Sequence, residues 1–115
     1  MSEQSTPEPK QLTLHKKSRT LEVEFVNGER FILPCEYLRV FSPSAEVQGH
    51  GAGNEKWVVG KEYVNILAIE PVGHYAVKLI FSDGHRSGIY SWSTLYSLGI
   101  HQERNWQNYL AKRNS

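Results

Sequence analysis

The fold is indicated most clearly by residues 20–34, TLEVEFVNGERFILP. Polar and apolar side chains alternate through this stretch, which is typical of two strands that each bury one face. The buried face is expected to consist of Leu21, Val23, Phe25, Phe31 and Leu33. Asn27-Gly28 between the strands predicts a hairpin turn. A strict two-residue turn would set Glu24 opposite Phe31, so matching the apolar faces requires one further loop residue or a bulge.

A second group of strands is predicted between residues 65 and 90. Residues 65–70 form a strand that ends at Pro71, and residues 75–81 form the most apolar strand, which we expect at the centre of the sheet. Asp83-Gly84 predicts a second hairpin turn, after which residues 87–90 return along the sheet.

Three short helical segments follow from apolar spacing and end signals. Residues 36–41 have helical spacing that Ser42-Pro43 interrupts. Ser91 is expected to cap a second helix that Gly99 ends, and residues 101–112 form a terminal helix on the domain surface. We therefore predict an α+β fold, with one small antiparallel sheet of about five strands and two or three short helices on one face.

The length of 115 residues fits one domain, which we expect over residues 12–112 after a disordered tail at residues 1–11. The net charge of +1 argues against general electrostatic binding to nucleic acid. No apolar run reaches the ~18 residues of a membrane span, and the first residues lack a signal-peptide pattern. Cys35, the single cysteine, excludes an internal disulfide and fits a reducing compartment, so we expect a cytoplasmic protein.

Several residues carry reactive or ligating groups, but none falls in a complete catalytic motif. Cys35 lies at a predicted helix start, where a thiol can have a lowered pKa; the alternative is a buried small apolar residue. Residues 49–56, GHGAGNEK, do not match a phosphate-binding loop and are expected to form a surface loop. His50 and His85 could meet in the fold with Asp83 or Cys35 to bind iron or zinc.

Two segments taken together resemble one known family. They are residues 38–51, LRVFSPSAEVQGHG, and residues 81–99, FSDGHRSGIYSWSTLYSLG. They resemble the small bacterial domain similar to the N-terminal domain of gamma-butyrobetaine hydroxylase, and the resemblance covers about residues 10–110. In the hydroxylases this domain precedes a 2-oxoglutarate- and iron-dependent oxygenase domain. That catalytic domain does not fit within this sequence, so the resemblance does not imply hydroxylase activity here.

The resemblance also implies positions for a structural zinc ion. In the hydroxylases three cysteines follow a W-L-R segment in the pattern C-x-C-x-x-C, and a histidine completes the site. Tyr37-Leu38-Arg39 resembles the W-L-R segment, which assigns the cysteine positions to Ser42, Ser44 and Val47 and the histidine to His85. Since serine and valine are not zinc ligands, we expect no cofactor, and only His85 remains of the set.

The resemblance further implies a partner, because similar domains are attached to iron-dependent oxygenases and to Mrp-type ATPases of iron–sulfur cluster assembly. We predict a non-catalytic accessory domain that binds a partner protein, and neither nucleic acid nor a membrane. The alternative is a metal-binding protein associated with an oxidoreductase, in which His85 and His50 hold iron or zinc. The interaction surface is expected to consist of polar turn and loop residues: Arg39, Ser42, Ser44, Glu46, Gln48, His50, His85, Arg86 and Ser87.

Overall fold

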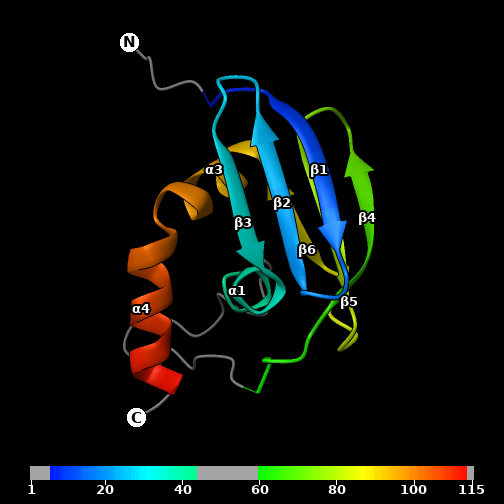
Figure 1. Cartoon of the computed structure of the whole chain (residues 1–115). Helices are drawn as coiled ribbons and strands as arrows, with labels where there is room; N and C mark the ends of the chain where they lie inside the picture. Colours follow the sequence, from blue (N-terminus) through cyan, green and yellow to red (C-terminus); the bar gives the residue numbers. More distant parts are fainter. Residues whose placement is uncertain (1–5, 44–59, 114–115) are drawn as a thin grey trace.

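The computed structural model describes residues 6–43 and 60–113, and every structural statement below concerns those residues. This part of the chain forms six strands and three helices (Figure 1). In chain order they are β1 (Pro9–His15), β2 (Thr20–Phe25), β3 (Arg30–Pro34), α1 (Cys35–Val40), β4 (Ile66–Val72), β5 (Ala76–Phe81), β6 (Gly88–Ser91), α3 (Trp92–Ile100) and α4 (Gln102–Arg113).

The strands form two antiparallel sheets, a first sheet β1-β2-β3 and a second sheet β4-β5-β6. The two sheets lie one behind the other in Figure 1. The α+β class is therefore confirmed, whereas the single sheet of about five strands is wrong. Both predicted hairpins exist, but they belong to different sheets. The reason is that alternation identifies which face of a strand is buried and does not identify the element that buries it.

One hydrophobic core lies between the sheets. β5 occupies the centre of the second sheet, as its apolar composition predicted. The side chains that meet across the core are at most 5% exposed: Leu21, Val23, Phe25 and Leu33 from the first sheet, and Ile66, Val77, Leu79, Phe81 and Tyr90 from the second.

The hairpin between β2 and β3 has the extra loop residue that the sequence requires. Val23 lies opposite Phe31, and the amide of Phe25 donates to the carbonyl of Glu29 at 2.8 Å. The loop therefore holds three residues, 26–28. This register keeps the apolar side chains of both strands on the same face.

β1 and β4 differ most from the expected organisation, whereas β5 and β6 differ from the expected ranges by no more than one residue at either end. β1 begins at Pro9, so residues 9–11 of the expected tail belong to the first sheet. β4 runs through Pro71 to Val72 and does not stop before the proline. β4 is an edge strand, where a residue without an N–H group is tolerated because one side of the strand has no ladder to complete.

The three helices gather beside β3 (Figure 1). Ser91 caps α3 as predicted, since its hydroxyl accepts a hydrogen bond from the Thr94 amide at 3.1 Å. Gly99 does not end this helix, contrary to the expectation, because α3 continues to Ile100. A Cβ atom at Gly99 would lie 2.5 Å from ring atoms of Phe31. The glycine therefore permits close packing of α3 on β3 and is not a helix stop.

α4 lies on the side of the molecule, as expected for residues 101–112, and packs there through an apolar stripe. Tyr109 is fully buried, and the rings of Trp106 and Tyr37 pack in a T-shaped arrangement with centroids 6.1 Å apart. Among the helices of the described residues, none is both long and apolar enough to cross a membrane.

Candidate functional site

The two segments singled out from the sequence meet where the end of α1 lies against the turn between β5 and β6. Ser42 Oγ and His85 Nε2 are 3.0 Å apart, within hydrogen-bond distance. Ser42 is 2% exposed and His85 is 7% exposed. We call Arg39, Ser42, Lys61, Asp83 and His85 the corner cluster.

Asp83 holds two cations in the corner cluster. Its Oδ2 atom lies 2.8 Å from Arg39 Nε and 2.7 Å from Lys61 Nζ. Its Oδ1 atom accepts a hydrogen bond from the His85 backbone amide at 3.1 Å. Burial opposes ionisation of this carboxyl group, but the hydrogen bonds from Lys61, the His85 amide and Arg39 outweigh it and lower the pKa of Asp83 to about 2. Asp83 is therefore a carboxylate that fixes the turn to α1 and Lys61.

β6 supplies the inner wall of the corner cluster. The Tyr90 hydroxyl donates to the Leu38 carbonyl at 2.5 Å, and burial raises the pKa of this tyrosine. A Cβ atom at Gly88 would lie 2.6 Å from Ser42 Oγ. Glycine at this position therefore leaves the space in which the Ser42 hydroxyl reaches His85.

The burial of Ser42 and His85 decides what their hydrogen bond can do. A serine nucleophile must reach a substrate, and its histidine must exchange protons with it. Both side chains are almost entirely covered. The arrangement is therefore a structural contact that joins the end of α1 to the β5–β6 turn.

The residues of the corner cluster do not fit a zinc ion. The Ser42 hydroxyl is a poor zinc ligand, and its oxygen is at hydrogen-bond distance from the His85 nitrogen. The adjacent cations Arg39 and Lys61 would repel a divalent metal. In residues 6–43 and 60–113, no three His, Cys, Asp or Glu side chains gather where they could hold a metal ion.

The structure describes five of the nine residues expected to form an interaction surface. Ser42 and His85 are buried, the Arg39 side chain is 12% exposed, and Arg86 and Ser87 are exposed on the β5–β6 turn. The remaining residues, with Val47 of the implied zinc set, lie outside the described residues: Ser44, Glu46, Gln48 and His50. The interaction surface and the alternative metal site on His85 and His50 both stay predictions.

Cys35 is a buried residue, which is the second of the two roles considered from the sequence. The side chain is 0% exposed, and burial raises the pKa of the thiol to about 11. Its Sγ atom lies 3.8 Å from Asn65 Oδ1. The thiol is therefore protonated at neutral pH and is a core residue.

Lys61 and Asn65 were not identified from the sequence. The Asn65 side-chain amide donates to the Lys16 carbonyl at 3.1 Å. Its backbone amide donates to Ser82 Oγ at 2.9 Å, and its carbonyl accepts from the Ser82 amide at 2.8 Å. Asn65 therefore ties the β1–β2 turn to the β5–β6 hairpin. No local pattern reveals such a residue, because its partners lie 17 and 49 positions away.

These features define a small two-sheet α+β domain in which one corner is held by buried polar side chains. The chain belongs to the family described as gamma-butyrobetaine hydroxylase-like, N-terminal, whose model matches residues 12–96. The resemblance read from the sequence is thereby confirmed.

Three solved structures are similar to this chain. A crystal structure of a protein of unknown function from Acidithiobacillus ferrooxidans, a member of the DUF971 family, is 38% identical with a TM-score of 0.65 and covers 80% of this chain and 92% of its own. An NMR solution structure is 54% identical with a TM-score of 0.81 and covers 97% of this chain and 83% of its own. A second NMR structure is 43% identical with a TM-score of 0.81. The match covers 96% of this chain and 87% of the chain in that structure. The comparison with curated proteins gives no match.

Proposed function

We propose that this domain is a non-catalytic accessory module that binds a partner protein at the β5–β6 turn. The observation that supports it is that the polar groups of the corner cluster pair with one another, Ser42 and His85 being buried, while Arg86 on the same turn is exposed. Loops held on a firm scaffold commonly present recognition residues. The corner cluster would then position the turn, and Arg86 would contact the partner.

The partner that we propose is an iron-dependent oxygenase or an ATPase of iron–sulfur cluster assembly. Membership of a family described by the N-terminal part of a hydroxylase supports the first of these. An exposed guanidinium group is well suited to a carboxylate on such a partner, since it can form two parallel hydrogen bonds.

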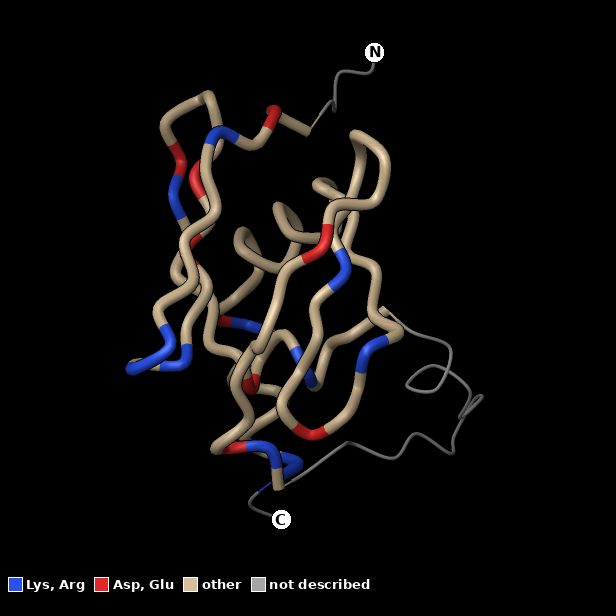
Figure 2. The backbone as a smooth tube through the Cα atoms, turned by 90° about the vertical axis from the view of Figure 1, so that its right-hand side faces the viewer, with Lys and Arg blue, Asp and Glu red and all other residues tan. Residues whose placement is uncertain are grey.

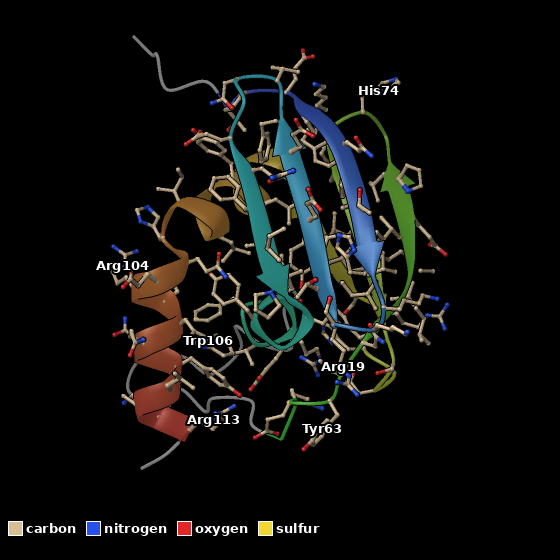
Figure 3. The ribbon with its side chains drawn as sticks, viewed as in Figure 1. Arg19, Tyr63, His74, Arg104, Trp106 and Arg113 are labelled. Carbon is tan, nitrogen blue, oxygen red and sulfur yellow. The ribbon has the colours of Figure 1, made fainter. Side chains whose placement is uncertain are left out.

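The test compares Arg86→Ala with Arg104→Ala. Arg104 is an exposed arginine of α4 (Figure 3), so both variants lose one exposed guanidinium group. Binding of each variant to purified candidate partners is measured together with its thermal unfolding midpoint. We expect Arg86→Ala to bind about fivefold more weakly with an unchanged midpoint, and Arg104→Ala to bind as the unaltered protein does. Equal binding by all three proteins would contradict the proposal.

A further inference from the structure

The turn between β1 and β2 carries three exposed cations within four residues. Residues 16–19 read KKSR, and Lys16, Lys17 and Arg19 are all exposed. None of the three forms an ion pair with another described residue. Figure 2 shows the β1–β2 turn, with its basic residues in blue, at the lower left of the molecule.

This turn is held in a defined conformation. The Lys16 carbonyl accepts from the Asn65 side chain at 3.1 Å, and the Arg19 carbonyl accepts from the Cys35 amide at 2.8 Å. Arg19 has a φ of 56°, in the left-handed region that non-glycine residues rarely adopt. Strain of this kind persists where the surrounding structure imposes it, and it is found more often at functional sites.

An exposed aromatic ring lies beside the turn. The Arg19 guanidinium carbon is 5.4 Å from the centre of the Tyr63 ring, and Tyr63 is 79% exposed. Figure 3 shows the two side chains at the same end of the molecule. A tyrosine so exposed offers apolar contact area and a hydroxyl at little cost in side-chain entropy, which is why this residue type is enriched in protein interfaces.

The carboxylates near this end are paired with residues other than Lys16, Lys17 and Arg19. Glu22 lies 2.9 Å from His15 and 3.2 Å from Arg30. Asp83 is paired with Arg39 and Lys61, while Arg113 lies beside Glu36 and Glu62. The field above the turn is therefore positive, although the net charge of the whole chain is only +1.

We infer that Lys16, Lys17, Arg19 and Tyr63 form a docking surface for an acidic segment of the partner protein. This inference rests on the proposed function and names a second contact on the same end of the domain as the β5–β6 turn. Three exposed cations on one turn, with an aromatic ring beside Arg19, match a few carboxylates of a peptide. They are too few for the long row of phosphate contacts on which nucleic-acid binding depends.

The inference is tested with a short fluorescent peptide rich in Asp and Glu, and with the matching peptide of Asn and Gln. The variant is the double substitution Lys16→Gln and Lys17→Gln. The control is Lys10→Gln with Arg30→Gln, which removes the same charge from side chains that are each 62% exposed. Lys10 and Arg30 lie at the opposite ends of their strands from the β1–β2 turn.

We expect the first variant to bind the acidic peptide about fivefold more weakly and the control variant to bind within about twofold of the unaltered protein. Added salt should weaken binding, the uncharged peptide should not bind, and amide resonances should shift at residues 16–19 and 61–63. Equal weakening by both variants would overturn the inference. Tighter binding of single-stranded DNA or of anionic vesicles than of the peptide would overturn it as well.

Partner capture separates this inference from the proposed function. Loss of capture in both Arg86→Ala and the Lys16, Lys17 variant supports both. Loss in Arg86→Ala alone overturns the docking surface and leaves the proposed function standing. Capture that neither change reduces overturns both.

Discussion

The corner cluster and the contact between α4 and α1 use similar groups in different surroundings. At the corner, Ser42 and His85 are buried and Asp83 holds two cations. At the α4 contact, Glu36 accepts from the Tyr109 hydroxyl at 2.7 Å and from Arg113 at 2.8 Å.

The two regions differ in how easily water can replace a lost partner. Arg113 also lies 3.6 Å from Glu62, whose side chain is 43% exposed. The α4 contact also lies partly outside residues 12–96, which the family model matches. A buried polar group that loses its partner keeps its full desolvation cost, whereas an exposed one is rehydrated. Tyr109 is fully buried and the Glu36 side chain is 11% exposed, so the well-exposed part of the α4 contact is the pair of Arg113 with Glu62. The buried hydrogen bond between Ser42 and His85 should therefore respond much more strongly to substitution than that outer pair.

The largest effect is expected from His85→Ala. This change removes the hydrogen bond to Ser42 and the ring that packs against Phe81, with centroids 5.9 Å apart. We expect a loss of about 2–3 kcal/mol in the free energy of unfolding, measured by urea denaturation. His74→Ala is the control, because His74 is exposed (Figure 3). Equal stability of the two variants would show that the corner contributes nothing.

Acid should weaken the corner through Asp83. The pKa of this group falls from its ordinary 3.8 to about 2 in the folded protein, so the unfolded chain binds the proton more readily. Because solvent partly screens this exposed residue, the carboxylate contributes about 1–1.5 kcal/mol above pH 4, and this stability is lost as the pH falls from about 4 to about 2. Denaturation curves of Asp83→Asn, which cannot titrate, should show a shallower acid dependence. An unchanged acid dependence would show that the Asp83 carboxylate does not stabilise the corner cluster.

A smaller effect is expected from Tyr109→Phe at the α4 contact. The ring remains packed against Trp106 at a centroid distance of 5.3 Å, and Arg113 remains on Glu36. The partly buried hydrogen bond from Tyr109 to Glu36 is lost, so the thermal midpoint should reflect a loss of about 1 kcal/mol. A loss of stability as large as that of His85→Ala would contradict the expectation that the corner cluster is more sensitive to substitution than the α4 contact.

The smallest effect is expected from Glu62→Gln. Its carboxylate lies 3.6 Å from Arg113 and is well exposed. Ion pairs of this kind contribute about 0.5 kcal/mol or less, so the unfolding curve should nearly superimpose on that of the unaltered protein. A clear loss of stability here would mean that solvent exposure is a poor guide to the two regions.

The sequence predicted local structure well, because local patterns encode it. Alternation located β2 and β3, the Asn27-Gly28 signal located their turn, and Ser91 marked the start of α3. The pairing of whole sheets could not be derived in the same way, since two faces with the same alternation can lie in one sheet or pack against each other. Gly99 shows a related limit, because a glycine at a helix end and a glycine under an aromatic ring look alike in a sequence.

The candidate site was predicted only in part, and for a physical reason. Ser42 and His85 were picked out by the family resemblance, and the structure brings them together. Lys61 and Asn65 carried no signal, because their partners come from distant segments. Their roles depend on the fold and not on neighbouring residues.

The most direct test of the account is thermal unfolding of protein purified without added metal, before and after treatment with a strong chelator. The central claim is that direct side-chain contacts hold the corner, without a metal ion. The account predicts that the thermal midpoint changes by no more than about 1 °C, and that mass spectrometry finds no stoichiometric zinc or iron. A fall of many degrees with chelator, together with one bound metal ion per chain, would contradict it.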